Sequence, residues 1–99
     1  MDKKALRSFI KHYGHVKQLE VAIEECSELI KAIVKYIRND VHMSPENVST
    51  GHIKAIVEEI ADVEIMLEQL KIIFDCHEEV EEEITYKITR QVERMLNNQ

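Results

Sequence analysis

The scarcity of turn-forming residues is the strongest constraint on how this chain folds. Its 99 residues include only two glycines and one proline. Glycine and proline are the residues that most readily end a helix or allow the backbone to reverse direction. Pro45 and Gly51 fall in the same short segment, and Gly14 stands alone near the N-terminus. The rest of the sequence therefore has few places to turn, and we expect long helices.

The apolar residues between these breaks recur at spacings of three and four, which is typical of helices that face a core. No alternating strand pattern is present, so we predict a single all-α domain over residues 1–99. The predicted helices run from Asp2 to Tyr13, ending at Gly14, from Val16 to Arg38, from His52 to Phe74, and from the irregular segment Asp75–His77 to Asn97. Between the second and third helices, Asn39–Gly51 is the main predicted loop, in which Ser44, Pro45 and Glu46 could start one helical turn.

Composition excludes several classes of function. A net charge of −6 argues against a protein that binds nucleic acid. No apolar run is long enough for a transmembrane helix, and the N-terminus lacks the hydrophobic region of a signal peptide. Cys26 and Cys76 lie fifty residues apart in or beside apolar segments, so we interpret them as reduced thiols in or near the core. These features together predict a cytoplasmic protein without a membrane partner.

An acidic phrase occurs twice, once in each of the two longest predicted helices. It reads Glu24-Glu25-Cys26-Ser27-Glu28-Leu29 and then Glu58-Glu59-Ile60-Ala61-Asp62-Val63. Residues three apart share a helix face, so Glu25 with Glu28, and Glu59 with Asp62, each present two carboxylates on one side. If the helices pack together, four carboxylates meet, which is unfavourable unless a cation lies between them. Mg²⁺ prefers such oxygen ligands.

The alternative is a pair of ordinary amphipathic helices. Nineteen of the residues are acidic, and pairs three apart also occur elsewhere, as at Asp75/Glu78. The two chosen pairs differ because apolar residues surround them, which predicts partial burial and a need for partners. The carboxylate pattern alone leaves both interpretations open.

Basic and polar residues that suit polyphosphate chemistry lie outside these phrases. Lys87, Arg90 and Arg94 share one face of the last predicted helix, where they either hold phosphate oxygens or form a solvated helix end. His15 and Gln18, near Gly14, could line a nucleoside pocket, or they are surface residues at a helix end. None of the five histidines follows a carboxylate by three residues, which counts against a di-iron bundle.

The residues as a set resemble a known family. The pattern Gln18-x-x-Val21-Ala22-x-Glu24-Glu25-x-Ser27-Glu28-Leu29, followed by Glu58-Glu59-x-x-Asp62-Val63, is similar to the all-α nucleoside triphosphate pyrophosphohydrolases of the MazG-like superfamily. The similarity spans roughly Gly14 to Leu70 and is expected to extend to Lys87 and Arg90. It looks most like the compact single-domain members of bacteria and their phages, and it implies a four-helix bundle completed by oligomerisation.

This resemblance implies an enzyme that cuts a nucleoside triphosphate into the monophosphate and pyrophosphate. Glu25, Glu28, Glu59 and Asp62 would hold Mg²⁺, with Mn²⁺ as a possible substitute. Further residues would assist: Glu24 and Glu58 as secondary metal ligands, and Lys87 and Arg90 as phosphate-binding residues. The chain departs from the family in a spacer of 30 residues between Glu28 and Glu59, and in Gln69, which stands where many members carry asparagine. Gln69 could therefore alter recognition of the base or sugar.

Two rival functions are a helical interaction module without catalysis and, less favoured, a carboxylate-bridged metal oxidase. We also expect a homodimer or homotetramer, with the active site close to a subunit boundary. The second and third helices carry apolar residues beyond one narrow stripe: Ile23, Ile30 and Val34 on one, and Ile65, Met66 and Ile72 on the other. A 99-residue monomer would leave part of that surface exposed, and such surface normally marks an interface.

Overall fold

A computed structural model describes residues 1–39 and 50–98, and every regular element in these ranges is a helix. The helices are α1 (Lys3–Tyr13), α2 (His15–Asn39), α3 (Thr50–Phe74) and α4 (His77–Asn97). The all-α prediction is therefore confirmed. The helical turn expected at Ser44–Glu46 lies outside the described residues.

The start and end of α1 follow the sequence closely. Asp2 caps the helix, because its side chain accepts a hydrogen bond from the backbone N–H of Ala5 at 3.0 Å. Gly14 ends it with a φ of 89°, a left-handed conformation that glycine adopts without the steric cost of a side chain. The next helix begins at once, at His15.

Four predicted boundaries differ from the structure by one or two residues. Helix α1 begins at Lys3 and α2 at His15, each one residue from its predicted start. Asn39 belongs to α2, and α3 begins at Thr50 instead of His52, so Gly51 is helical. Glycine is least unfavourable near a helix end, where few intrahelical bonds depend on it. The break before α4 occurs without glycine, because Asp75 itself adopts a positive φ of 49°.

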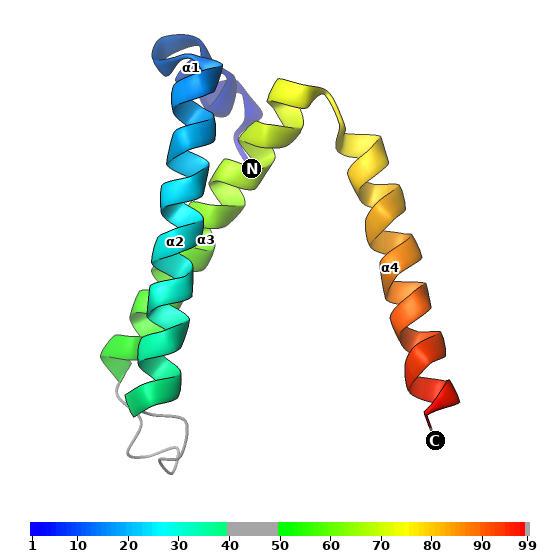
Figure 1. The fold of residues 1–99 in the computed structure, drawn as a ribbon. Helices are drawn as coiled ribbons and strands as arrows, with labels where there is room; N and C mark the ends of the chain where they lie inside the picture. The colour runs from blue at the N-terminus through cyan, green and yellow to red at the C-terminus, as the bar shows by residue number, and fades with distance from the viewer. Residues whose placement is uncertain (40–49, 99) are drawn as a thin grey trace.

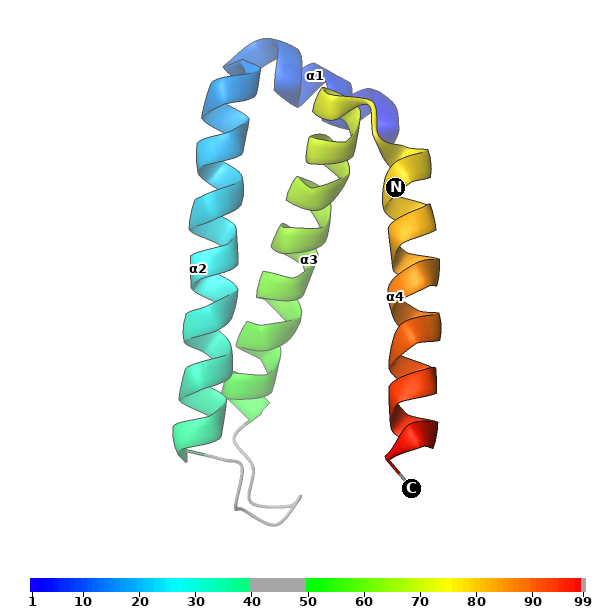
Figure 2. The ribbon, with the colours of Figure 1, turned by 45° about the vertical axis from the view of Figure 1, so that its right-hand side comes forward.

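Helices α2 and α3 form an antiparallel pair, and α1 crosses one end of it (Figure 1). Both views show α4 standing apart from this pair beyond its junction with α3 (Figure 2). Within the described ranges, α4 contacts only α3. One chain therefore packs three of its helices together and does not by itself close a four-helix bundle.

The buried core of the described residues is small. Its buried apolar side chains are Leu6, Ala22, Ala32 and Met66. Two glutamines, Gln18 of α2 and Gln69 of α3, are buried with them. The prediction that Met66 extends the exposed apolar surface was wrong, because it packs in this core. Cys26 was also expected in or near the core, but its side chain is exposed.

Candidate metal centre

The centre consists of three carboxylates where α2 and α3 face each other. Glu25 comes from α2, and Glu59 and Asp62 come from adjacent turns of α3. One oxygen from each carboxylate can be chosen so that all three lie within 4.8 Å of one another. Glu25 and Glu59 are half-buried, and Asp62 is exposed. The spacing of three residues places Glu59 and Asp62 on the same face of α3, and helix pairing brings Glu25 to them.

Glu28, the fourth predicted ligand, lies at the edge of this group. Its side chain is exposed and its Oε1 lies 3.8 Å from Nζ of Lys31, one turn along α2. It is nevertheless close enough to raise the pKa of both Glu25 and Glu59 through its charge. The described geometry therefore brings three of the four predicted ligands together and leaves Glu28 beside them. Glu24 and Glu58, predicted as secondary ligands, are exposed next to the centre.

The electrostatics of the group favour a shared cation. Partial burial raises the pKa of Glu25, and the charges of Asp62 and Glu59 and a hydrogen bond with Asp62 raise it further. The pKa of Glu59 is raised by desolvation and then by Asp62, Glu28 and Glu58. Each pKa shift reflects partial burial first, and then the cost of keeping several negative charges together. A divalent cation would remove that cost.

One oxygen of Glu59 gives a further indication that the residues fit a metal ion. Its Oε2 is shielded from solvent and has no hydrogen-bond partner. A buried polar atom without a partner is costly, and a metal ion is one way to satisfy it. The donor set of carboxylate oxygens suits a hard cation such as Mg²⁺ or Mn²⁺. Glu25, Glu59 and Asp62 are the residues that would hold it.

The glutamines predicted to bind substrate are bonded to each other. Nε2 of Gln18 donates to Oε1 of Gln69 at 2.7 Å, and Nε2 of Gln69 lies 3.5 Å from Sδ of Met66. Gln69 is only 1% exposed. This pair joins α2 to α3 in the core, so both amides already have partners in the structure described. His15 is exposed at the start of α2.

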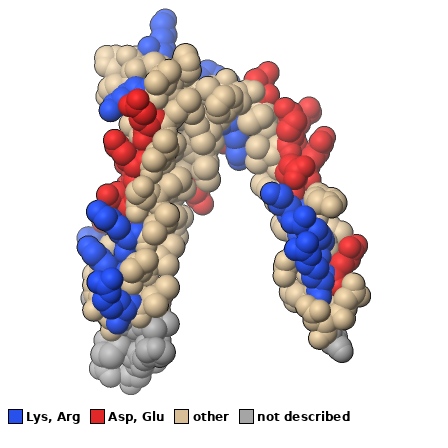
Figure 3. All heavy atoms as spheres, viewed as in Figure 1, with Lys and Arg blue, Asp and Glu red and all other residues tan. Residues whose placement is uncertain are grey.

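The basic residues predicted to hold phosphates lie on α4, away from the carboxylates. Figure 3 shows Lys and Arg side chains gathered along α4, separated from the acidic side chains of α2. The guanidinium of Arg90 stacks over the ring of Tyr86 at 5.5 Å, and its Nε is buried without a hydrogen-bond partner. Lys87 is exposed. Within one chain, these residues are not brought to Glu25 and Glu59.

Sequence reasoning missed an ion pair at the junction of α3 and α4. Nε2 of His77 lies 2.6 Å from Oε1 of Glu68, and Nζ of Lys71 lies 3.8 Å from Oε2 of the same carboxylate. The hydrogen bond to His77 and the nearby positive charges hold the pKa of Glu68 below its usual value. The nine-residue separation of Glu68 and His77 matches no helical spacing. Their contact depends on how the chain turns at Asp75, and the sequence pattern does not predict the geometry of that turn.

Comparison with known proteins finds no matching family, no similar curated protein and no similar solved structure. None of the helices formed by the described residues is both long enough and apolar enough to cross a membrane.

Proposed function

We propose that the chain is a Mg²⁺-dependent hydrolase that cuts a nucleoside triphosphate into the monophosphate and pyrophosphate. The observation that carries the proposal is the convergence of Glu25, Glu59 and Asp62 from two helices, with a solvent-shielded Glu59 oxygen that lacks a partner. The resemblance of the two acidic phrases to MazG-like pyrophosphohydrolases supplies the reaction.

The roles of the residues follow from their positions. Glu25, Glu59 and Asp62 would bind the cation, while Glu28, which is exposed at the edge, would bind it through water or accept a proton. A bound Mg²⁺ would neutralise phosphate charge and lower the pKa of a coordinated water. Mn²⁺ is the expected substitute. Lys87 and Arg90 remain proposed phosphate-binding residues.

The alternative of a helical interaction module without catalysis is favoured by one observation. Many large apolar side chains are exposed along α2, α3 and α4. An interaction role and catalysis are compatible, so the exposed surface does not decide between them. Turnover that depends on Mg²⁺ would distinguish an enzyme from a module without catalysis.

A panel of nucleoside triphosphates, incubated with the protein and Mg²⁺ and resolved by chromatography, tests the proposal. We expect monophosphate and pyrophosphate in equal amounts, and no turnover with chelator. The Asp62→Asn variant, purified in parallel, controls for contaminating hydrolases. Release of orthophosphate as the first product, or equal turnover by the wild type and Asp62→Asn, would contradict the proposal.

A further inference from the structure

Helix α4 leaves α3 through a short turn in which only Asp75 and Cys76 separate the two helices. The backbone N–H of Asp75 donates to the carbonyl of Ile72 at 3.3 Å. The N–H of Cys76 donates to the carbonyl of Lys71 at 3.1 Å. These two bonds, with Asp75 in the left-handed conformation, form a Schellman motif, in which glycine is the usual residue at that position. The motif ends α3, and its bonds involve no side chain of α4.

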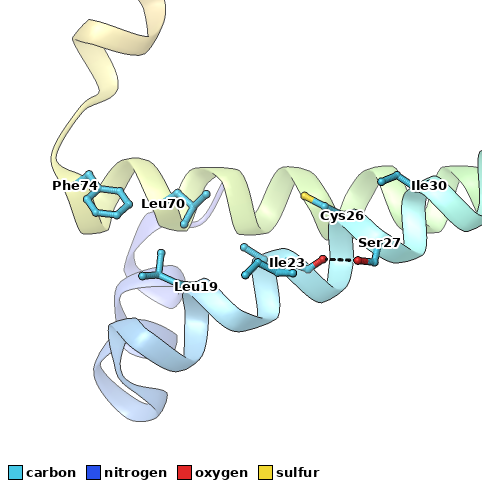
Figure 4. Close-up of a pocket in the computed structure, with 8 residues that line it drawn as sticks. Leu19, Ile23, Cys26, Ser27, Ile30, Leu70 and Phe74 are labelled. Carbon is cyan, nitrogen blue, oxygen red and sulfur yellow. Dashed lines mark hydrogen bonds between the residues drawn. The ribbon is translucent and has the colours of Figure 1, made fainter.

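The apolar side chains that line the groove at this end of α3 do not hold α4. Leu70 and Phe74 line a groove of about 500 Å³ together with α2 residues such as Leu19 and Ile23. Figure 4 shows that α4 lies away from these side chains. Among the described residues, α4 contacts no helix except α3. The polar contacts at the junction therefore become important for the direction of α4.

A shielded side-chain contact joins the first residue of α4 to a point well inside α3. Nε2 of His77 lies 2.6 Å from Oε1 of Glu68, which stands six residues before the end of α3. Only 14% of the Glu68 side chain and 38% of the His77 side chain are exposed. A hydrogen bond to an ionised group is shorter and stronger than one between neutral groups. The contact therefore ties α4 to α3 at a second point, beyond the turn.

The acceptor in this contact, Glu68, is held by groups from three helices. Lys71, one turn along α3, places its Nζ 3.8 Å from Oε2 of Glu68 and leaves Oε1 to His77. The hydrogen bond with His77 lowers the pKa of the Glu68 carboxyl, and the charges of Lys71 and of Lys3, in α1, lower it further. The ionised carboxylate is therefore favoured, and it accepts the hydrogen bond from Nε2 of His77.

We propose that Glu68 and His77 form a latch that sets the direction in which α4 leaves α3, and so positions Lys87 and Arg90. The second part rests on the proposed function, in which Lys87 and Arg90 hold phosphate oxygens, whereas the first part does not. Glu68 and His77 are positioning residues, because they act through α4.

The length of α4 magnifies the effect of the latch. Arg90 lies thirteen residues beyond His77, or about 20 Å along the helix. A change of about 20° in the direction of α4 would therefore move Arg90 by about 7 Å. Displacements much smaller than this weaken catalysis, because the groups that position a substrate must lie close to their working geometry. A contact that contributes little to stability can thus control where Arg90 lies.

Distances between two spin labels test the latch directly. The labels are attached at two exposed positions, Lys54→Cys of α3 and Gln91→Cys of α4, in a chain whose native cysteines are replaced by alanine. Each labelled chain is refolded with an excess of unlabelled chain, so that the distances measured lie within one chain. We expect one narrow distribution for the otherwise wild-type sequence. His77→Ala and Glu68→Ala should each shift its mean by about 5 Å or double its width, since a turn of about 15° moves position 91 that far.

Two further variants serve as controls for the latch. Glu79→Ala removes an exposed carboxylate from the same first turn of α4 and should leave the distribution unchanged. His77→Gln supplies an amide donor in place of the imidazole and should restore most of the narrow distribution. A broad wild-type distribution, a wild-type distribution in His77→Ala or Glu68→Ala, an equal change in Glu79→Ala, or no recovery in His77→Gln would overturn the latch. Circular dichroism checks that all variants remain helical.

Kinetic measurements separate the latch from the proposed reaction. His77→Ala should raise KM for the triphosphate several-fold and change kcat by less than about twofold, because it displaces groups proposed to bind phosphate. Adding His77→Ala to the double variant Lys87→Ala/Arg90→Ala should change KM no further. An unchanged KM in His77→Ala, or a further rise in the combined variant, would overturn the positioning role. If the wild type has no turnover, the hydrolysis proposal fails, while the distances still decide whether the latch exists.

Discussion

Replacing Gln69 tests whether the buried glutamine pair stabilises the fold or recognises substrate. In Gln69→Leu, the amide of Gln18 would remain buried, at 6% exposure, without the partner that now lies at 2.7 Å. An unsatisfied buried amide costs about 1–3 kcal/mol. For a domain of this size, each 1 kcal/mol lowers the melting temperature by roughly 4–8 °C. We therefore expect the melting temperature, measured by circular dichroism, to fall by about 4–24 °C.

The double variant Gln18→Leu/Gln69→Leu sharpens this prediction. It removes both amides, so no buried group is left unpaired, and we expect much of the lost stability to return. Gln91→Leu, at an exposed position of α4, is the matched control and should change stability by less than about 0.5 kcal/mol. All melts need one protein concentration, because association alters apparent stability. Wild-type stability of Gln69→Leu, combined with lost turnover, would refute the structural role and favour substrate recognition.

Three further predictions concern charged residues. Glu25→Gln and Asp62→Asn should each lose more than about 90% of turnover, measured by pyrophosphate release, because each removes a proposed cation ligand. Circular dichroism should show unchanged helical content. Normal activity in both variants would exclude the centre. The lowered pKa of Glu68 means that its pairing with His77 stabilises the fold above the unfolded-state pKa and is lost as the pH falls through the lower folded-state pKa. Thus His77→Ala should lower the free energy of unfolding, measured by denaturant titration, by under about 1 kcal/mol at neutral pH and not at all in strong acid. A loss of stability that does not depend on pH would contradict the pairing. Arg90→Ala should raise KM for the triphosphate several-fold, whereas an unchanged KM would remove Arg90 from phosphate binding.

The helices were predictable from sequence because the signals that end them are local. Gly14 is the clearest case, since its positive φ is a conformation that glycine favours. The turn at Asp75 has no such signal, because a non-glycine residue adopts the unusual conformation. The direction of α4 was not predictable either. An amphipathic pattern shows which side of a helix is apolar, but it does not name the surface that covers it.

The carboxylate centre was predictable in part for the same reason. Helical spacing places Glu59 and Asp62 on one face, and the structure brings Glu25 to them. The same rule placed Glu28 with Glu25, yet Glu28 is exposed beside Lys31. Two helices face each other along a narrow line, and neighbours three apart diverge by about 60° around the helix. Both members of the α3 pair reach this line, whereas only Glu25 of the α2 pair does, and spacing alone does not distinguish the two cases.

Titration with Mn²⁺, followed by the loss of the free-ion signal in electron paramagnetic resonance, tests the central claim most directly. It detects the cation without requiring the correct substrate. We expect the wild-type protein to bind Mn²⁺, Mg²⁺ to compete, and Glu59→Gln to bind at least roughly tenfold more weakly. Glu64→Gln, at an exposed position on α3 outside the centre, should bind like the wild type. Equal Mn²⁺ affinity in the wild type and Glu59→Gln would contradict a metal centre at Glu25, Glu59 and Asp62.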